Sequence, residues 1–160
     1  MRRTFALAAF FTMLASFVAG AGDRIDGALK KADELISKAE FSRARAELDS
    51  IVEVITGDDA RIVRWHEREG AAWLGEGKVE EARASFLEAL QVAKRLKAAA
   101  GNDAAHAYTG LGVCLRREGN DAFALKFFKK ALTADIDEGT RMFAEDQIRE
   151  LEGAPPLPAR

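Results

Sequence analysis

Residues 105–132, AHAYTGLGVCLRREGNDAFALKFFKKAL, constrain the fold of this chain more than any other stretch. Apolar residues recur there at spacings of three and four on both sides of Gly119-Asn120, which predicts two amphipathic helices joined by a tight turn. Gly112 and Ala124 are small where the two antiparallel helices would cross, and Phe128 is large where the next unit must be filled. The stretch therefore predicts a helical hairpin.

The order of these residues resembles the tetratricopeptide repeat. In that repeat an aromatic residue, a Leu-Gly pair and a large residue on the first helix precede Ala-x3-Phe on the second helix. Here the positions hold Tyr108, Leu111-Gly112, Leu115 and Ala124-x3-Phe128. The resemblance implies an α-solenoid, in which helix pairs stack side by side and the first helix of each pair lines a concave surface.

A second stretch, residues 60–99, matches the same pattern. His66 stands for the first aromatic residue, Gly70 for the glycine of the Leu-Gly pair, and Ala82-x3-Phe86 for the second helix. Glu69, in place of the leucine, is its departure from the pattern. These residues predict a second repeat.

The alanines at the expected helix crossings give the repeat length. Ala44, Ala82 and Ala124 are separated by 38 and 42 residues, whereas this repeat usually spans about 34 residues. The excess falls in residues 95–103, which predicts that the fourth helix, beginning at Val79, is a turn or two longer than usual.

The two ends of the solenoid follow weaker patterns. Residues 24–56 carry Ala44-x3-Leu48 but have Ala32 where the glycine is expected, and a terminal repeat is often atypical. Residues 138–152 predict a seventh helix, apolar on one side and charged on the other, as a solenoid cap requires. The prediction is an all-α solenoid of about three repeats (24–56, 60–99 and 104–134) in a domain over 22–153, with the capping helix 138–152 and a flexible tail over 154–160.

Residues 1–21, MRRTFALAAFFTMLASFVAGA, have the three parts of a secretory signal peptide. Arg2 and Arg3 give a basic start, residues 5–18 are apolar, and small residues follow up to Ala21. This core is shorter than the roughly 20 residues that span a bilayer, so we predict cleavage after Ala21, export to a periplasmic or secreted location, and no stable membrane insertion. An uncleaved segment that tethers the chain to a membrane is the alternative.

No pattern in the chain predicts an active site, a metal site or a cofactor. His66 and His106 lack the His-x3-His spacing of a zinc helix. Gly110-Leu111-Gly112 lies within a predicted helix with no strand before it, so it has no basis as a phosphate loop. The single Cys114 is predicted to be a buried apolar residue. With 24 basic and 26 acidic residues, the net charge of −2 gives no field that would attract nucleic acid.

The resemblance implies a groove that holds an extended peptide or a partner helix. Asp33, Ala71 and Val113 stand where one arm of the family uses Asn and Lys to grip a carboxylate, so that clamp is not predicted. The groove is mixed in charge with a basic end at Arg116-Arg117, which predicts an acidic or amphipathic protein segment as ligand. The groove residues implied by the resemblance are Lys30, Asp33, Arg64, Glu67, Arg68, Ala71, His106, Thr109, Val113, Arg116 and Arg117.

Two functions follow from these patterns. The first is an exported, non-enzymatic adaptor or scaffold that binds a peptide or helix of an envelope partner in the groove. The second is a self-associating subunit of an envelope assembly, because three repeats are about the minimum for a stable solenoid and a second copy would complete the core. The sequence does not identify the partner.

Overall fold

The computed structural model describes the backbone of residues 4–99 and 101–153, and side chains from residue 20 onward within those ranges. The predicted tail, 154–160, and the side chains of the predicted signal peptide up to residue 19 lie outside the described residues. Within the described ranges every regular element is helical, which confirms the all-α prediction. The helices are α1 (Thr4–Ser37), α2 (Phe41–Asp49), α3 (Arg61–Gly75), α4 (Val79–Arg95), α5 (Asn102–Arg117), α6 (Asp121–Ala131) and α7 (Glu138–Leu151).

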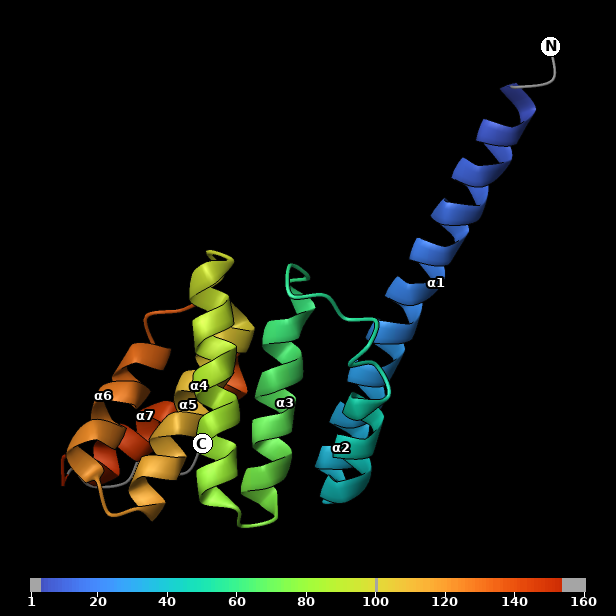
Figure 1. Ribbon diagram of the computed structural model, residues 1–160. Helices are drawn as coiled ribbons and strands as arrows, with labels where there is room; N and C mark the ends of the chain where they lie inside the picture. The colour runs from blue at the N-terminus through green and yellow to red at the C-terminus, as the bar shows by residue number, and fades with distance from the viewer. Residues whose placement is uncertain (1–3, 100, 154–160) are drawn as a thin grey trace.

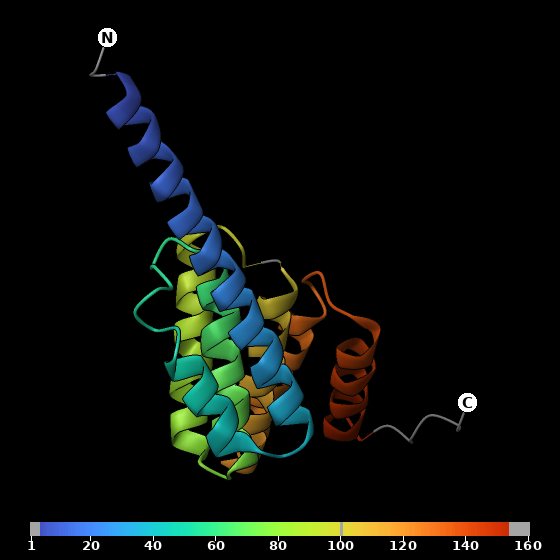
Figure 2. The same cartoon turned by 90° about the vertical axis from the view of Figure 1, so that its right-hand side faces the viewer.

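Successive helices pack as pairs, α1 with α2, α3 with α4 and α5 with α6, and α7 packs against α6 and α5. Figure 1 shows the pairs following one another from α1–α2 on the right to α5–α6 and α7 on the left. Figure 2 views the stack from its α1–α2 end, with the other pairs behind and α7 on the right. The fold is therefore the predicted α-solenoid, with α7 covering the apolar end.

The first helix extends further than the sequence predicts. A helix was expected from Arg24, but α1 begins at Thr4 and runs without interruption to Ser37. Its N-terminal half projects beyond the body of the molecule in Figure 1, and the first buried side chain among those described is Ile25. Within the described residues, none of the helices has an apolar stretch long enough to cross a bilayer.

The second and third repeats each close on an aromatic ring that needs a glycine opposite it. A Cβ atom added to Gly70 would lie 2.8 Å from the ring of Phe86, and one added to Gly112 would lie 2.6 Å from the ring of Phe128. Phe86 is 2% exposed and Phe128 is 0% exposed. The missing side chain of each glycine therefore lets a whole ring fill the contact between two helices.

The first repeat has Ala32 in place of the glycine and Leu48 in place of the phenylalanine. Ala32 and Leu48 are sixteen residues apart, the same spacing as each glycine and its ring, and both are fully buried in one cluster of apolar side chains. Leucine is smaller than phenylalanine, so a methyl group is tolerated opposite it. The atypical first repeat is thus a compensated version of the other two.

α4 is longer than the other second helices, but the prediction that residues 95–103 lengthen it is wrong. α4 has 17 residues, compared with 9 in α2 and 11 in α6. It ends at Arg95, so most of residues 95–103 form the connection to α5 rather than further helix. α2 ends at Asp49, and turns occupy the residues up to Ile55.

Cys114 lies on α5 and is 0% exposed. Burial raises the pKa of its thiol to about 11. Because the thiolate is the reactive form, we expect a thiol-reactive dye at pH 8 to label the native chain at least about 100-fold more slowly than the chain in denaturant. Equal labelling rates in the two conditions would show that Cys114 is accessible.

Glu76, at the turn between α3 and α4, ties this turn to α2. Its two carboxylate oxygens accept hydrogen bonds from Nη2 of Arg45 at 2.8 and 3.0 Å, and one also accepts from Oγ of Ser42 at 2.8 Å. The Arg45 guanidinium in turn lies 3.5 Å from the centre of the Trp73 ring. These hydrogen bonds, that of Arg45 first, lower the pKa of Glu76 to about 2.

Replacing Glu76 with glutamine tests this contact through its pH dependence. The pKa of Glu76 is lower in the folded chain than the ordinary value of 4.5, so its charge stabilises the fold above that pH and this contribution is lost as the pH falls towards about 2. We expect the difference in free energy of unfolding between the native chain and Glu76→Gln, measured by urea denaturation, to be largest at pH 7 and to vanish near pH 2. The exposed Glu53→Gln is the control and should show no such trend.

Candidate functional site on the concave face

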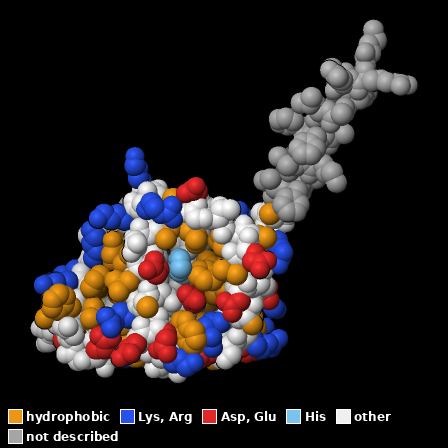
Figure 3. Space-filling view, in the orientation of Figure 1, with side chains coloured by type: hydrophobic (Ala, Val, Ile, Leu, Met, Phe, Trp, Pro, Cys, Tyr) orange, Lys and Arg blue, Asp and Glu red, His pale blue; other side chains and the backbone are white. Residues whose placement is uncertain are grey.

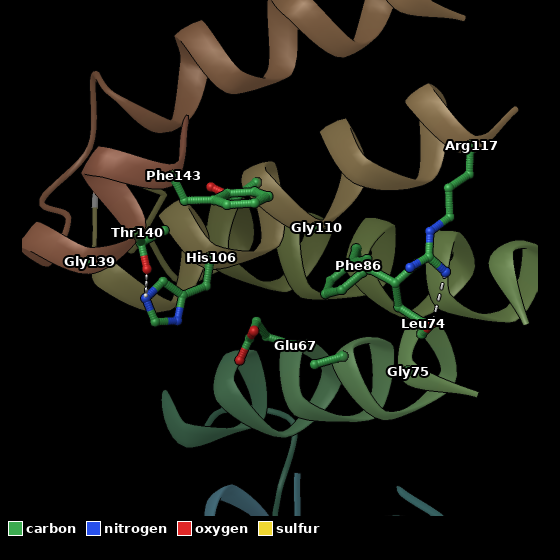
Figure 4. Close-up of a pocket in the computed structure, with 12 residues that line it drawn as sticks. Glu67, Leu74, Gly75, Phe86, His106, Gly110, Arg117, Gly139, Thr140 and Phe143 are labelled. Atoms are coloured by element: carbon green, nitrogen blue, oxygen red, sulfur yellow. Dashed lines mark hydrogen bonds between the residues drawn. The ribbon is translucent and has the colours of Figure 1, made fainter. Parts of the chain in front are cut away.

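A pocket of about 470 Å³ opens between α3, α5 and α7. α3 and α5 are the first helices of the second and third pairs, and α7 occupies the position of a fourth first helix. Figure 4 shows the side chains converging on this space from the three helices, with Phe86 of α4 behind them. The pocket is lined by Glu67, Ala71, Leu74, Gly75, Phe86, His106, Thr109, Gly110, Arg117, Gly139, Thr140 and Phe143.

The middle of the pocket is apolar because of a glycine. A Cβ atom on Gly110 would lie 2.3 Å from the ring of Phe86, so the ring reaches the pocket only because Gly110 has no side chain. At the rim, Phe143 of α7 is 43% exposed, and its ring packs edge-on against that of Phe128, with 6.3 Å between the ring centres. The pocket thus has the buried ring of Phe86 at its base and the exposed ring of Phe143 at its rim.

One end of the pocket is an ion-pair network between α1 and α3. Glu67 of α3 is only 4% exposed and pairs with Arg68, which also pairs with Asp33 of α1. Burial raises the pKa of the Glu67 carboxyl. Burial alone would lower the pKa of Arg68, but the charges of Glu67 and Asp33 outweigh it and raise that pKa. The network therefore holds the half-buried positive charge of Arg68 between two acids.

His106 of α5 connects this network to α7. Its Nδ1 atom lies 3.3 Å from Nη1 of Arg68, and because arginine can only donate, Nδ1 must accept and the proton must lie on Nε2. Nε2 donates to Oδ2 of Asp137 and lies 3.0 Å from Oγ1 of Thr140. Oδ1 of Asp137 accepts from the backbone N–H of Thr140 at 3.0 Å, which caps α7. The hydrogen bond from His106, then that from Thr140, lower the pKa of Asp137.

Arg116 and Arg117 lie near the other end of the pocket, and only Arg117 lines it. Arg116 donates to Oε2 of Glu150 on α7 at 2.7 Å and also to Gln147. Arg117 is exposed and donates from Nη1 to the carbonyl oxygen of Leu74 at 3.0 Å. Among the described residues no carboxylate lies within ion-pair distance of Arg117. Of the two arginines at the predicted basic end, Arg117 is therefore the one without an ion-pair partner among the described residues.

Comparison with known proteins supports the assignment of the repeats. Residues 66–137 match the family model of the tetratricopeptide repeat. Among solved structures, a TPR-like protein from Chlorobium tepidum TLS superimposes with a TM-score of 0.66 at 19% sequence identity, over 84% of this chain and 98% of that one. The fold is a tetratricopeptide-repeat solenoid. A search of curated proteins found no match.

The TPR pattern placed five of the eleven groove residues on the pocket: Glu67, Ala71, His106, Thr109 and Arg117. Asp33, Arg64 and Arg68 lie in the adjoining ion-pair network, where Arg64 pairs with Asp33. The other three do not line the pocket: Lys30 is exposed on α1, Val113 packs against the apolar side chains of α6 and α7, and Arg116 is paired with α7.

The wall that α7 contributes was missed by sequence reasoning, which treated residues 138–152 only as a cap. Gly139, Thr140 and Phe143 line the pocket from this helix. A signal was present, because Thr140 follows His106 by 34 residues, the usual length of the TPR repeat. α7 is therefore a first helix of the TPR type as well as a cap.

Proposed function

We propose that this chain is an exported, non-enzymatic adaptor that binds a segment of an envelope protein in its concave groove. The observation that supports this most is the pocket itself, which the first helices of successive repeats build together and which has the exposed ring of Phe143 at its rim. TPR repeats generally mediate protein–protein contacts. The signal-peptide pattern of residues 1–21 supports export.

The test is an affinity capture from the cells that naturally make the protein. The full chain carries a C-terminal tag, so that any leader is processed by the cell, and a charge-reversed form with Arg116→Glu and Arg117→Glu is captured in parallel. We expect one envelope protein to bind the native form and to be lost from the charge-reversed form. Arg43→Glu, at a residue exposed on α2, is the control and should retain the partner.

The same preparation tests export. Cleavage after Ala21 predicts that the purified chain begins at Gly22, which N-terminal sequencing and intact mass would establish. A purified chain that still begins at Met1 and fractionates with membranes would support the tethered alternative.

In the capture experiment, a partner retained by the charge-reversed form would contradict binding at the basic end of the groove.

Self-association is the second candidate, because α7 takes the place of a first helix and no second helix follows it in the described part of the chain. Met142 on α7 is 48% exposed and Phe123 on α6 is 51% exposed. In the face shown in Figure 3, hydrophobic side chains are open to solvent among acidic and basic ones. Size-exclusion chromatography with light scattering separates the two candidates, since a dimer that survives dilution favours self-assembly and a monomer favours the adaptor.

A further inference from the structure

We propose that the pocket receives one large apolar side chain of the bound segment, and that Arg117 binds an Asp or Glu side chain within the same segment. This inference rests on the proposed function, because it assumes that a protein segment lies in the groove. It adds the chemistry that the segment must have. Two features of the pocket support it, one apolar and one electrostatic.

The apolar feature is an aromatic surface of the size of a side chain or small ligand. Phe86 lies behind Gly110, Phe143 stands at the rim, and Ala71 and Leu74 complete the wall. The volume of about 470 Å³ falls within the range of roughly 300–1,000 Å³ that is typical of ligand pockets. Covering the half-exposed ring of Phe143 with an apolar side chain would be favourable.

The electrostatic feature is the difference between the two ends of the pocket. At the inner end Glu67 is ion-paired with Arg68, and Asp137 accepts a hydrogen bond from His106. Glu67 is the one carboxylate among the described residues that line the pocket, so a cationic ligand would meet no unpaired carboxylate in the lining. At the other end Arg117 uses one guanidinium N–H for Leu74, and a guanidinium has five.

A carboxylate is the group that matches this arrangement. Arginine binds carboxylates through paired, charge-assisted hydrogen bonds, and the neighbouring Glu118 is held by Arg83 at 3.0 Å rather than by Arg117. Arg116 is neutralised by Glu150. The ligand should therefore combine an apolar side chain over Phe86 with a single acidic side chain near Arg117.

The experiment uses a library of random nine-residue peptides selected on the full chain immobilised through a C-terminal tag. Enriched peptides are synthesised with acetylated and amidated ends, and their affinities are measured by fluorescence anisotropy. We expect a large apolar residue and a nearby Asp or Glu to recur among them. Arg117→Gln should weaken binding about tenfold or more, and Ala71→Phe, which places a ring in the pocket, should do the same.

Two controls distinguish direct recognition from a change in fold. Arg43→Gln, at an exposed residue of α2, should bind the peptides as the native chain does, and all variants should give the native circular dichroism spectrum. In addition, Arg117→Glu should bind a peptide with lysine in place of its acidic residue better than the original peptide. A merely structural role of Arg117 would not produce this exchange of preference.

The outcomes separate this inference from the proposed function. Peptides that bind equally well to Arg117→Gln and Ala71→Phe, or enriched peptides without an acidic residue, would overturn the inference and leave peptide binding established. Binding only when the peptide has a free C-terminal carboxylate would overturn the assignment of Arg117 to an acidic side chain. If no peptide is enriched on the native chain, the inference and the proposed function both fail.

Discussion

Replacing Phe128 with alanine is expected to lower the free energy of unfolding by about 3–5 kcal/mol. The ring is 0% exposed and packs on Gly112 of α5 and in one cluster with Ala144 of α7. Its loss would leave a cavity between the third repeat and the helix that covers it, and packed helices relax only partly into such a space. Urea denaturation followed by circular dichroism at 222 nm measures the change.

Phe123 on the same helix provides the matched control. It is 51% exposed and its ring lies 4.6 Å from Nζ of Lys126, so Phe123→Ala removes little buried surface and a weak cation–π contact. We expect this change to cost less than about 1 kcal/mol. Equal losses of stability for Phe123→Ala and Phe128→Ala would contradict the packing described for α6 and α7.

Replacing Arg68 with methionine is expected to destabilise the fold by about 3–5 kcal/mol, because it leaves Glu67 buried without its cation. The side chain of Arg68 is 17% exposed and that of Glu67 is 5% exposed. The second substitution, Glu67→Gln, removes the unpaired charge. We therefore expect the double variant Glu67→Gln/Arg68→Met to recover part of the lost stability in urea denaturation.

Arg64 separates burial from pairing in this test. Like Arg68, Arg64 pairs with the carboxylate of Asp33, but its side chain is 38% exposed. Arg64→Met should therefore cost about 1 kcal/mol or less. The burial argument fails if Arg68→Met costs no more than Arg64→Met, or if adding Glu67→Gln makes Arg68→Met worse.

The helix pairs could be predicted from the sequence because they depend on contacts between residues that are close in the chain. The small crossing residue Gly112 and the ring of Phe128 are sixteen residues apart, and the helical period alone places them on facing sides of a hairpin. The full extent of α1 could not be predicted in the same way. The sequence pattern marked residues 1–21 as a separate segment, and only the structure shows that the helix continues through this boundary.

The site was predicted less completely, since it depends on how successive repeats are oriented. The resemblance placed Glu67 and His106 on the concave face, and both line the pocket. The pairing of Arg68 with Asp33 joins residues 35 positions apart on different repeats, so it depends on the angle between α1 and α3. Phe143 could not be predicted for a similar reason, because its place at the pocket rim depends on where α7 packs.

The position of Phe86 has a mechanical consequence. Its ring contacts the sites of Gly70 in its own repeat and Gly110 in the next, and apolar side chains from α3, α4 and α5 share one cluster around it. Because the second and third repeats share this ring, neither repeat can unfold alone without exposing it. Stretched from its ends in an optical trap, the molecule is expected to lose the second and third repeats in one rupture. The groove would then keep its curvature while force is applied to a bound partner.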